Sequence, residues 1–327
     1  MSKAKQEDLV GRSMAAVEAQ AAPHPMRLTE IWKWVSGYIW PWNSLYTAIA
    51  ILTWLYCTPE MARMKHLAPD WIGFIFLRNL VLIGLYVSAW HIPLYVRRTQ
   101  GTNHKYSARW LTTDSSIFMF RDQFLDNLFW TVCSAVPIWT GYEVATFWCQ
   151  ANGLIPTINW WAHPIYCAAI LLMIPALRSI HFYAIHRLIH WPPLYRSVHY
   201  LHHKNVNPGP WSGLAMHPVE HLLYFSGVLL HWVIPSHPLH ALAHLQHLAL
   251  SPCTGHSGFD RVLLSRRVSV DTYGYTHYLH HRYFEVNYGG DAVPIDRWMG
   301  TFHDGSAKAQ EALKKRLLER RNDRQRA

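Results

Sequence analysis

Histidine is the residue type in this chain whose placement could support chemistry, because it is concentrated in one region. Seventeen of the 23 histidines lie between His181 and His281. The first cluster is an HxxxH motif formed by His186 and His190. On a helix, residues i and i+4 lie one turn apart on the same face, so both imidazoles can bind one metal ion from one side. The spacing therefore predicts a metal site.

Two further clusters repeat the pattern HxxHH, and we expect each to offer up to three ligands to one point. The eight imidazoles of the three clusters exceed the four ligands of a structural zinc ion, so we predict two metal ions. Imidazole binds Zn, Cu, Fe and Ni alike. Zinc has no redox chemistry, whereas iron with dioxygen fits the apolar substrate that a membrane setting favours. The two copies are His199-Tyr-Leu-His202-His203 and His277-Tyr-Leu-His280-His281.

A competing motif is His217-Pro-Val-Glu-His221, an HxxEH of the kind found in zinc peptidases, where the glutamate acts as a general base. Only three positions of this motif are fixed, so a histidine-rich chain produces it easily by chance. We favour a helix that starts near Pro218, with Glu220 orienting a metal-binding histidine through a hydrogen bond.

The remaining histidines have weaker claims to a metal. His256 lies next to a turn shortly before the third cluster and is a further candidate ligand. His240, His244 and His247 share one helix face, and both an approach to the metals and the lining of a polar cavity stay open. Isolated histidines are expected to be ordinary residues; they are His24, His66, His91, His104 and His163.

The clusters need a scaffold, and four apolar stretches approach the roughly 20 residues that span a bilayer. Tryptophan and tyrosine gather at their ends, which is typical of membrane interfaces. A fifth stretch, Leu222 to Leu250, is broken at Pro235-Ser-His-Pro238. Because proline removes helix hydrogen bonds, we predict a re-entrant hairpin, with a pair of tilted, thin spans as the alternative. The four stretches are Trp42 to Cys57, Trp71 to Val96, Asn127 to Trp148, and Pro164 to Tyr183.

Lysine and arginine in the connecting loops predict the orientation. The loop from 97 to 126 contains Arg97, Arg98, Lys105, Arg109 and Arg121, whereas the loop from 150 to 163 contains neither residue type. We therefore place the first loop, both termini and everything after Tyr183 in the cytoplasm. The metal site is expected on the cytoplasmic side of the inner membrane in a bacterium, or of the endoplasmic reticulum in a eukaryote.

The composition favours a membrane protein over a nucleic-acid-binding one. Half of the 327 residues are apolar, and the mean hydropathy of -0.03 averages long apolar runs with polar ends. The net charge of +10 arises from loops and a basic tail. No nucleic-acid module is visible, so anionic lipid headgroups are the expected partner. The five cysteines form no CxxC pair and indicate neither a disulfide framework nor a thiolate metal site.

The expected fold class is all-α. We predict a polytopic integral membrane helical bundle, with about four spanning helices plus a re-entrant hairpin, and a cytoplasmic histidine-rich cap. The tail is expected to form a charged amphipathic helix. The predicted regions are a polar cytoplasmic N-terminal segment (1–34), an N-terminal transmembrane region (35–163), a catalytic region (164–306) and a basic C-terminal tail (307–327).

These motifs resemble the fatty acid hydroxylase/sterol desaturase superfamily of membrane di-iron oxygenases. Similar segments run in order from about Arg178 to Gly300: HRLIH, LYRSVHYLHH, HPVE, GHSGFD, THYLHHRYFEVNYG and DRWMGTF. Many members carry an acid several residues before the first motif, where this chain has Ser179 and an unusual His181. The resemblance implies two iron ions, without assigning each histidine to one ion. The implied ligands are His186, His190, His199, His202, His203, His256, His277, His280 and His281.

The resemblance also implies an oxygenase that uses dioxygen to hydroxylate or desaturate a lipid of sterol or fatty acyl type. An external electron donor, such as a cytochrome or ferredoxin type protein, is then required, because no haem, flavin or iron–sulfur motif is visible. Arg187, Arg196, Lys204 and the basic tail are candidate docking sites for it. Two alternatives stay open, which are a histidine-lined membrane metal transporter and an HxxEH-type zinc hydrolase.

Overall fold

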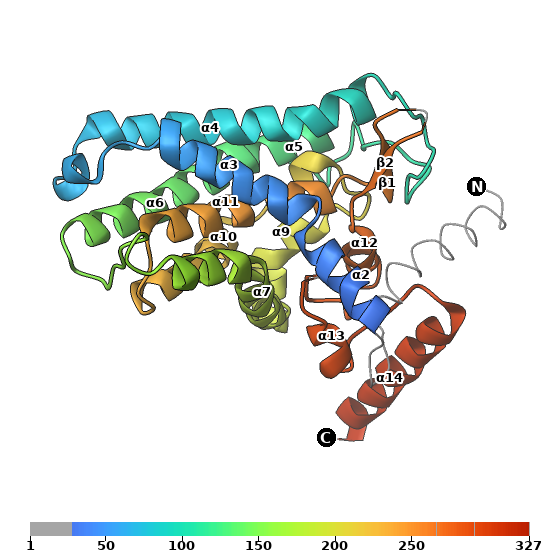
Figure 1. The fold of residues 1–327 in the computed structure, drawn as a ribbon. Coiled ribbons are helices and arrows are strands. Elements are labelled where there is room, and N and C mark those ends of the chain that lie inside the picture. Colours follow the sequence, from blue (N-terminus) through green and yellow to red (C-terminus); the bar gives the residue numbers. More distant parts are fainter. Residues whose placement is uncertain (1–27, 266, 291, 327) are drawn as a thin grey trace.

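The computed structural model describes residues 28–265, 267–290 and 292–326, and it is mostly helical (Figure 1). The long helices run side by side, and a cap of short helices, loops and a β-hairpin covers one end. Most of the predicted N-terminal segment lies outside the described residues, and its last residues begin α2 (Leu28–Ile39).

The centre of the bundle is α11 (Pro238–Gly255), which packs against α3 (Trp42–Tyr56), α4 (Pro69–His91), α6 (Val136–Ala151) and α7 (Pro164–Ile189). Almost every residue of α11 is buried, including its histidines. Five of its leucine and alanine side chains join the main hydrophobic core, and the other three belong to two smaller clusters. The polar residues of α11 must therefore find partners inside the protein.

Two of the four predicted spans fall on helices that are long and apolar enough to cross a membrane. Among the described residues, these helices are Pro69–Val96, which ends in a π-helical turn, and Pro164–Ile189. The predicted span that began at Trp42 is only 15 residues long as α3. The span predicted from Asn127 lies in a longer helical run, whose buried polar residues lower its hydropathy. This run comprises α5 (Gln123–Trp130), a π-helical turn (Thr131–Ala135) and α6.

The predicted hairpin is present, and its break lies where the prolines placed it. Its first arm is α10 (Pro218–Phe225), continued by a 3-10 helix (Ser226–Trp232), and its second arm is α11. Each arm is about 26 Å long, since a 3-10 helix rises about 2.0 Å per residue and an α-helix 1.5 Å.

The turn of the hairpin reaches the end of the bundle that lies opposite the cap. The Ser236 amide donates to the Pro156 carbonyl at 3.3 Å, and the Tyr166 hydroxyl donates to the Pro235 carbonyl at 3.0 Å. The turn is therefore level with the loop between α6 and α7. Among the described residues, neither arm is one of the two helices that are long and apolar enough to cross a membrane.

The cap contains one small sheet that we did not predict in an all-α fold. Strands β1 (Arg261–Leu263) and β2 (Ser269–Asp271) pair in antiparallel register. The predicted C-terminal helix is confirmed as α14 (Ala307–Arg326). The other cap helices are α8 (Pro192–Leu194), α9 (Tyr200–His203), α12 (Tyr275–Tyr283) and α13 (Ile295–Trp298), and a π-helical turn at Tyr195–His199 joins α8 to α9. Two 3-10 turns lie in other parts of the chain, at Met61–Lys65 and Pro210–Leu214.

Candidate metal centre

The structure brings all nine predicted histidines together at the junction of the bundle and the cap. They come from the end of α7, the π-helical turn and α9, the end of α11, and α12. They form two groups, and within each group the ligand nitrogens lie within 4.8 Å of one another. The first group is His186, His190, His199, His203 and His280, and the second is His202, His256, His277 and His281.

Each HxxHH motif contributes to both groups, so our expectation that one motif serves one point is wrong. His199 and His203 belong to the first group, and the intervening His202 belongs to the second. The third cluster is divided in the same way. A helix turns about 100° per residue, so residues i and i+4 point within about 40° of each other, whereas i+3 and i+4 differ by about 100°. Each motif therefore holds the two groups next to each other.

A glycine fixes how the segments meet. A Cβ atom at Gly274 would overlap the carbonyl oxygen of Gly255, so only glycine allows the start of α12 to lie against the end of α11. His256 and His277 follow these two glycines, and their rings lie 4.6 Å apart between centroids. The close approach of the two backbones therefore sets the spacing of the second group.

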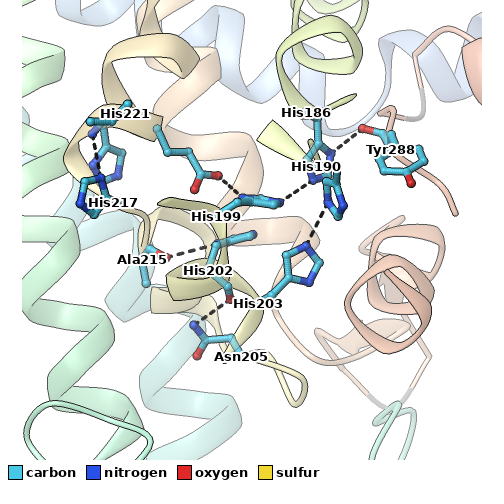
Figure 2. A network of polar contacts seen from close by, with 12 residues as sticks. His186, His190, His199, His202, His203, Asn205, Ala215, His217, His221 and Tyr288 are labelled. Atoms are coloured by element: carbon cyan, nitrogen blue, oxygen red, sulfur yellow. Dashed lines mark hydrogen bonds and ion pairs between the residues drawn. The ribbon is translucent and has the colours of Figure 1, made fainter. Parts of the chain in front are cut away.

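Backbone carbonyls hold the Nδ1 side of several rings (Figure 2). His186 Nδ1 lies 2.7 Å from the Tyr288 carbonyl, and His280 Nδ1 lies 2.6 Å from the Val286 carbonyl. His256 Nδ1 lies 2.8 Å from the Pro252 carbonyl oxygen of α11. A carbonyl only accepts, so the proton of each neutral ring lies on Nδ1 and leaves a lone pair on Nε2.

The Nε2 atoms face one another at short range. His186 and His199 approach to 3.1 Å, His203 and His280 to 3.1 Å, and His256 and His281 to 3.1 Å between Nε2 atoms. In the His186–His199 pair both Nδ1 atoms are held by oxygens, so two lone pairs face each other at this distance and repel, unless a cation lies between them. Nitrogens bound to one ion at about 2.1 Å are about 3.0 Å apart at a right angle and about 3.4 Å apart at a tetrahedral angle. The residues therefore fit two metal ions.

Burial keeps these imidazoles neutral. Desolvation lowers the pKa of His202 to about 4 and, despite the hydrogen bond to Val286, that of His280 to about 3. Desolvation together with neighbouring imidazoles holds the pKa of His203 well below its usual value. Metal ligation requires the neutral ring, so the site is prepared for a cation at neutral pH.

The glutamate of the HxxEH motif has the role that we favoured for it. His199 Nδ1 donates to Glu220 Oε1 at 2.8 Å, and His199 belongs to the first group. Pro218 starts α10, and His217 caps this helix by accepting from the Val219 amide. Neither His217 nor His221 belongs to a metal group among the described residues. The two histidines of the HxxEH motif therefore lie outside both candidate metal groups, and His221 contacts the Ser134 hydroxyl and the Leu214 carbonyl.

The histidines of α11 point to other partners. His240 Nε2 donates to the Cys167 carbonyl at 3.0 Å, and His244 Nδ1 lies 3.1 Å from His231 Nε2. His247 lies 2.8 Å from the Asn43 side chain and lines a cavity next to the second group. The cavity-lining alternative thus holds for His247.

The two positions that depart from the family pattern, Ser179 and His181, also lie outside both groups. Ser179 lines the cavity, and His181 Nε2 lies 3.0 Å from the Ser226 hydroxyl. Sequence reasoning did not identify this cavity, because its walls come from segments far apart in the chain. Only the polar residues inside an apolar helix, such as Arg178, gave a signal for it.

Comparison with known proteins adds the following similarities. Residues 169–301 match the fatty acid hydroxylase family. The chain is 28% identical to a Delta(7)-sterol 5(6)-desaturase of Candida glabrata, over 57% of this chain and 52% of the relative. It is 26% identical to a Delta(7)-sterol-C5(6)-desaturase of Nicotiana tabacum, over 52% of this chain and 61% of the relative. It is 32% identical to a methylsterol monooxygenase of Aspergillus fumigatus, over 44% of this chain and 48% of the relative. The chain thus matches about half the length of these relatives, and no solved structure matches it.

Proposed function

We propose that this chain, whose residues 169–301 match the fatty acid hydroxylase family, is a membrane enzyme that holds two iron ions and uses dioxygen to hydroxylate or desaturate a lipid. The observation that carries the proposal is the pair of buried histidine groups, in which Nε2 atoms face one another at 3.1 Å and carbonyls hold the Nδ1 atoms of His186 and His256. The similarity to sterol desaturases and a methylsterol monooxygenase supports a lipid as the substrate class.

Each part of the centre has a defined task. The first group offers five imidazoles, one more than a structural zinc ion takes, and the second offers four. Bound iron supplies the activation of dioxygen that an unactivated C–H bond requires. The protein's own residues hold the ions, fix the ring tautomers through carbonyls and Glu220, and exclude water by burial. No side chain acts as a general acid in this scheme.

The electrons come from a separate donor protein in this proposal, and the exposed basic residues of the cap are its docking site. Arg187 and Arg196 are exposed close to the first group. Lys204 is not suitable, because its side chain is only 12% exposed and its Nζ lies 3.2 Å from Asp126 Oδ2. Arg187 stacks on the Tyr288 ring at 4.4 Å, next to the carbonyl that holds His186.

The cap lies on the cytoplasmic side in this proposal. The basic loop 97–126 packs against the cap, where the Asp260 amide donates to the His104 carbonyl at 2.7 Å. The opposite end carries Arg63 and Lys65 in the turn before α4, so five basic residues at the cap end stand against two. The asymmetry is weaker than the two loops alone suggested, but it has the same sign.

Elemental analysis and oxygen uptake test the proposal together. Protein purified from membranes should contain about two iron ions per chain, and it should consume oxygen when supplied with a lipid extract and a reductant. His202→Ala should abolish uptake, whereas the isolated loop variant His66→Ala should keep it. One tightly bound zinc ion that is unaffected by His202→Ala would refute the proposal. Metal flux into liposomes without oxygen uptake would favour a transporter instead.

A further inference from the structure

A cavity of about 480 Å³ opens beside the histidine groups. Its lining includes His199, His202, His256 and His277 of the two groups, together with Trp34 and Tyr38 of α2. A volume in this range is typical of sites that enclose a small organic ligand. The cavity is therefore where a substrate carbon would approach the candidate metals.

One wall of the cavity carries a positive charge, Arg178. Arg178, Phe182 and His186 follow at four-residue spacing on α7 and so share one helix face. The guanidinium carbon lies 4.9 Å from the Phe182 ring centroid, and the Phe182 ring lies 4.8 Å from the His186 ring. Eight residues of α-helix place Arg178 about 12 Å from His186 along the axis.

The charge lies within a membrane-length helix. Arg178 belongs to the apolar helix Pro164–Ile189, whose outward residues Leu172, Met173 and Ile180 are exposed. Arginine stays ionised in proteins. An ionised residue at such a position is costly and usually faces a partner or a functional cavity. Arg178 faces the cavity.

The hydrogen bonding of Arg178 is incomplete. Its Nη2 donates to the Tyr224 hydroxyl at 3.3 Å, and its Nε has no hydrogen-bond partner. No carboxylate of the described residues lies within 4.0 Å of it, whereas Arg78 is paired with Glu143 and Arg261 with an aspartate at 3.2 Å. The charge of Arg178 is therefore left for a ligand to neutralise.

The backbone leaves room for such a ligand. A Cβ atom at Gly290 would lie 3.0 Å from Arg178 Nη1 and 3.2 Å from Ser179 Oγ, so a side chain at this position would crowd both groups. Arg178, Ser179 and Gly290 all line the cavity. The guanidinium and the Ser179 hydroxyl thus offer hydrogen-bond donors at one corner of the cavity.

We propose that Arg178 binds the anionic head of the substrate, a carboxylate or a phosphate carried by an aliphatic chain. This inference rests on the proposed function and narrows its substrate class. A guanidinium binds either group through two parallel hydrogen bonds. The aliphatic chain then passes Phe182, which lies between the guanidinium and the His186 ring, toward the histidine groups. A neutral sterol would leave the charge of Arg178 unpaired and should bind more weakly.

Direct binding tests this inference without turnover. Purified protein is titrated with palmitate, methyl palmitate, hexadecyl phosphate and cholesterol, and tryptophan fluorescence reports binding, because Trp34 and Trp42 line the cavity. We expect palmitate or hexadecyl phosphate to bind at least about tenfold more tightly than the two neutral ligands. The better of the two anions identifies the head as carboxylate or phosphate.

Variants then assign the effect to one residue. Arg178→Gln should lower the affinity for the preferred anion about ten- to hundredfold and leave methyl palmitate nearly unchanged. Arg178→Lys should retain part of the preference. Arg97→Gln, which removes an exposed arginine at the end of the other membrane-length helix and outside the cavity lining, is the control and should change none of the four affinities.

The inference is overturned if the wild-type protein binds methyl palmitate or cholesterol as tightly as both anions, a comparison that needs no variant. A second outcome also overturns it: the wild-type protein shows no preference for an anion, and Asp291→Asn does. Asp291, which lies outside the described residues, would then be the acid that neutralises Arg178. Binding requires neither iron nor oxygen, so failure of the oxygenase proposal and failure of this inference are distinguishable.

Discussion

The contact between Glu220 and His199 offers a sharp test of the centre. The two side chains are 4% and 1% exposed, and His199 Nδ1 donates to Glu220 Oε1 at 2.8 Å. This bond fixes the proton of His199 on Nδ1 and leaves its Nε2 facing His186 Nε2 at 3.1 Å. Glu220→Gln keeps the shape and an acceptor oxygen but removes the negative charge.

We expect Glu220→Gln to lower the metal affinity of the first group ten- to hundredfold, or about 1.4–2.8 kcal/mol, as is typical when a hydrogen-bond partner of a ligand histidine is changed. Glu220→Ala should cost about 1–3 kcal/mol more, because a buried N–H is left without an acceptor. Burial raises the pKa of the Glu220 carboxyl, and bound metal opposes this shift by favouring the carboxylate. The substitution therefore weakens the metal-bound state more than the metal-free protein.

Competition with a chelator, followed by elemental analysis, measures the affinity, and thermal melting of the metal-free protein measures stability. Glu143→Gln is the matched control, because Glu143 is also a buried carboxylate but pairs with Arg78 between α4 and α6. Glu143→Gln should lower the Tm and leave the metal affinity unchanged. Glu220→Gln should lower the metal affinity and leave the Tm of the metal-free protein nearly unchanged. A metal affinity within about threefold of wild type in Glu220→Gln, or an equal loss in both variants, would refute the reasoning.

Further outcomes follow from the two groups and their burial. His280→Ala should lose the ion of the first group and His202→Ala that of the second, and elemental analysis that finds both ions lost from either variant would contradict two separate sites. Burial lowers the pKa of His202 to about 4 and that of His280 to about 3, so the unfolded chain, with pKa values near 6.5, takes up protons first. The stability of the metal-free protein should therefore fall as the pH drops below about 6.5, by up to about 1.4 kcal/mol per pH unit for each such histidine. Thermal melting between about pH 7.5 and 4.5 checks this, and a Tm that rises toward acid would contradict it. Leu154→Cys, at a position that is 60% exposed, should react with an impermeant thiol reagent from outside intact cells, and a cysteine at the exposed Arg196 should not, in a background without the two exposed native cysteines. The reverse pattern would overturn the orientation.

The members of the histidine groups were predictable because helical periodicity places residues four apart on one face. His186 and His190, and likewise His199 and His203, lie in the same group for this reason. The partition of His202 into the other group was not predicted. The partition depends on two factors. One is the 100° rotation between neighbouring side chains of a helix, which follows from the local sequence. The other is the position of α12 in the fold, which the local sequence does not give.

The partners that orient the rings could be predicted only in part. Glu220 was identified because an acid beside clustered histidines has few other uses in a buried segment. The carbonyls of Val286 and Tyr288 carry no such signal, since every residue has a carbonyl and only the folded loop decides where it points. The surroundings of Arg178 could not be predicted either. Only the folded structure shows that no carboxylate of the described residues pairs with it, in contrast to Arg78 and Arg261.

The level at which the hairpin turns could be predicted only in part, for a geometric reason. Each half of the broken stretch, taken as an α-helix of about a dozen residues, is too short to span a bilayer, which favoured a turn inside it. The 3-10 conformation of Ser226–Trp232 lengthens the first arm by about 3.5 Å, because each residue rises about 0.5 Å more than in an α-helix.

The distribution of the candidate ligands along the chain bears on how the protein is made. His186 is synthesised about 100 residues before the carbonyls that orient His186 and His280, which at about 5–20 residues per second is a delay of about 5–20 s. During that time α7 exposes ligands with no completed site to receive them. An ion captured early would be held by a fraction of its final ligands and would exchange readily. We therefore expect both groups to reach their full metal affinity only after the ribosome has released α12 and the loop that follows it.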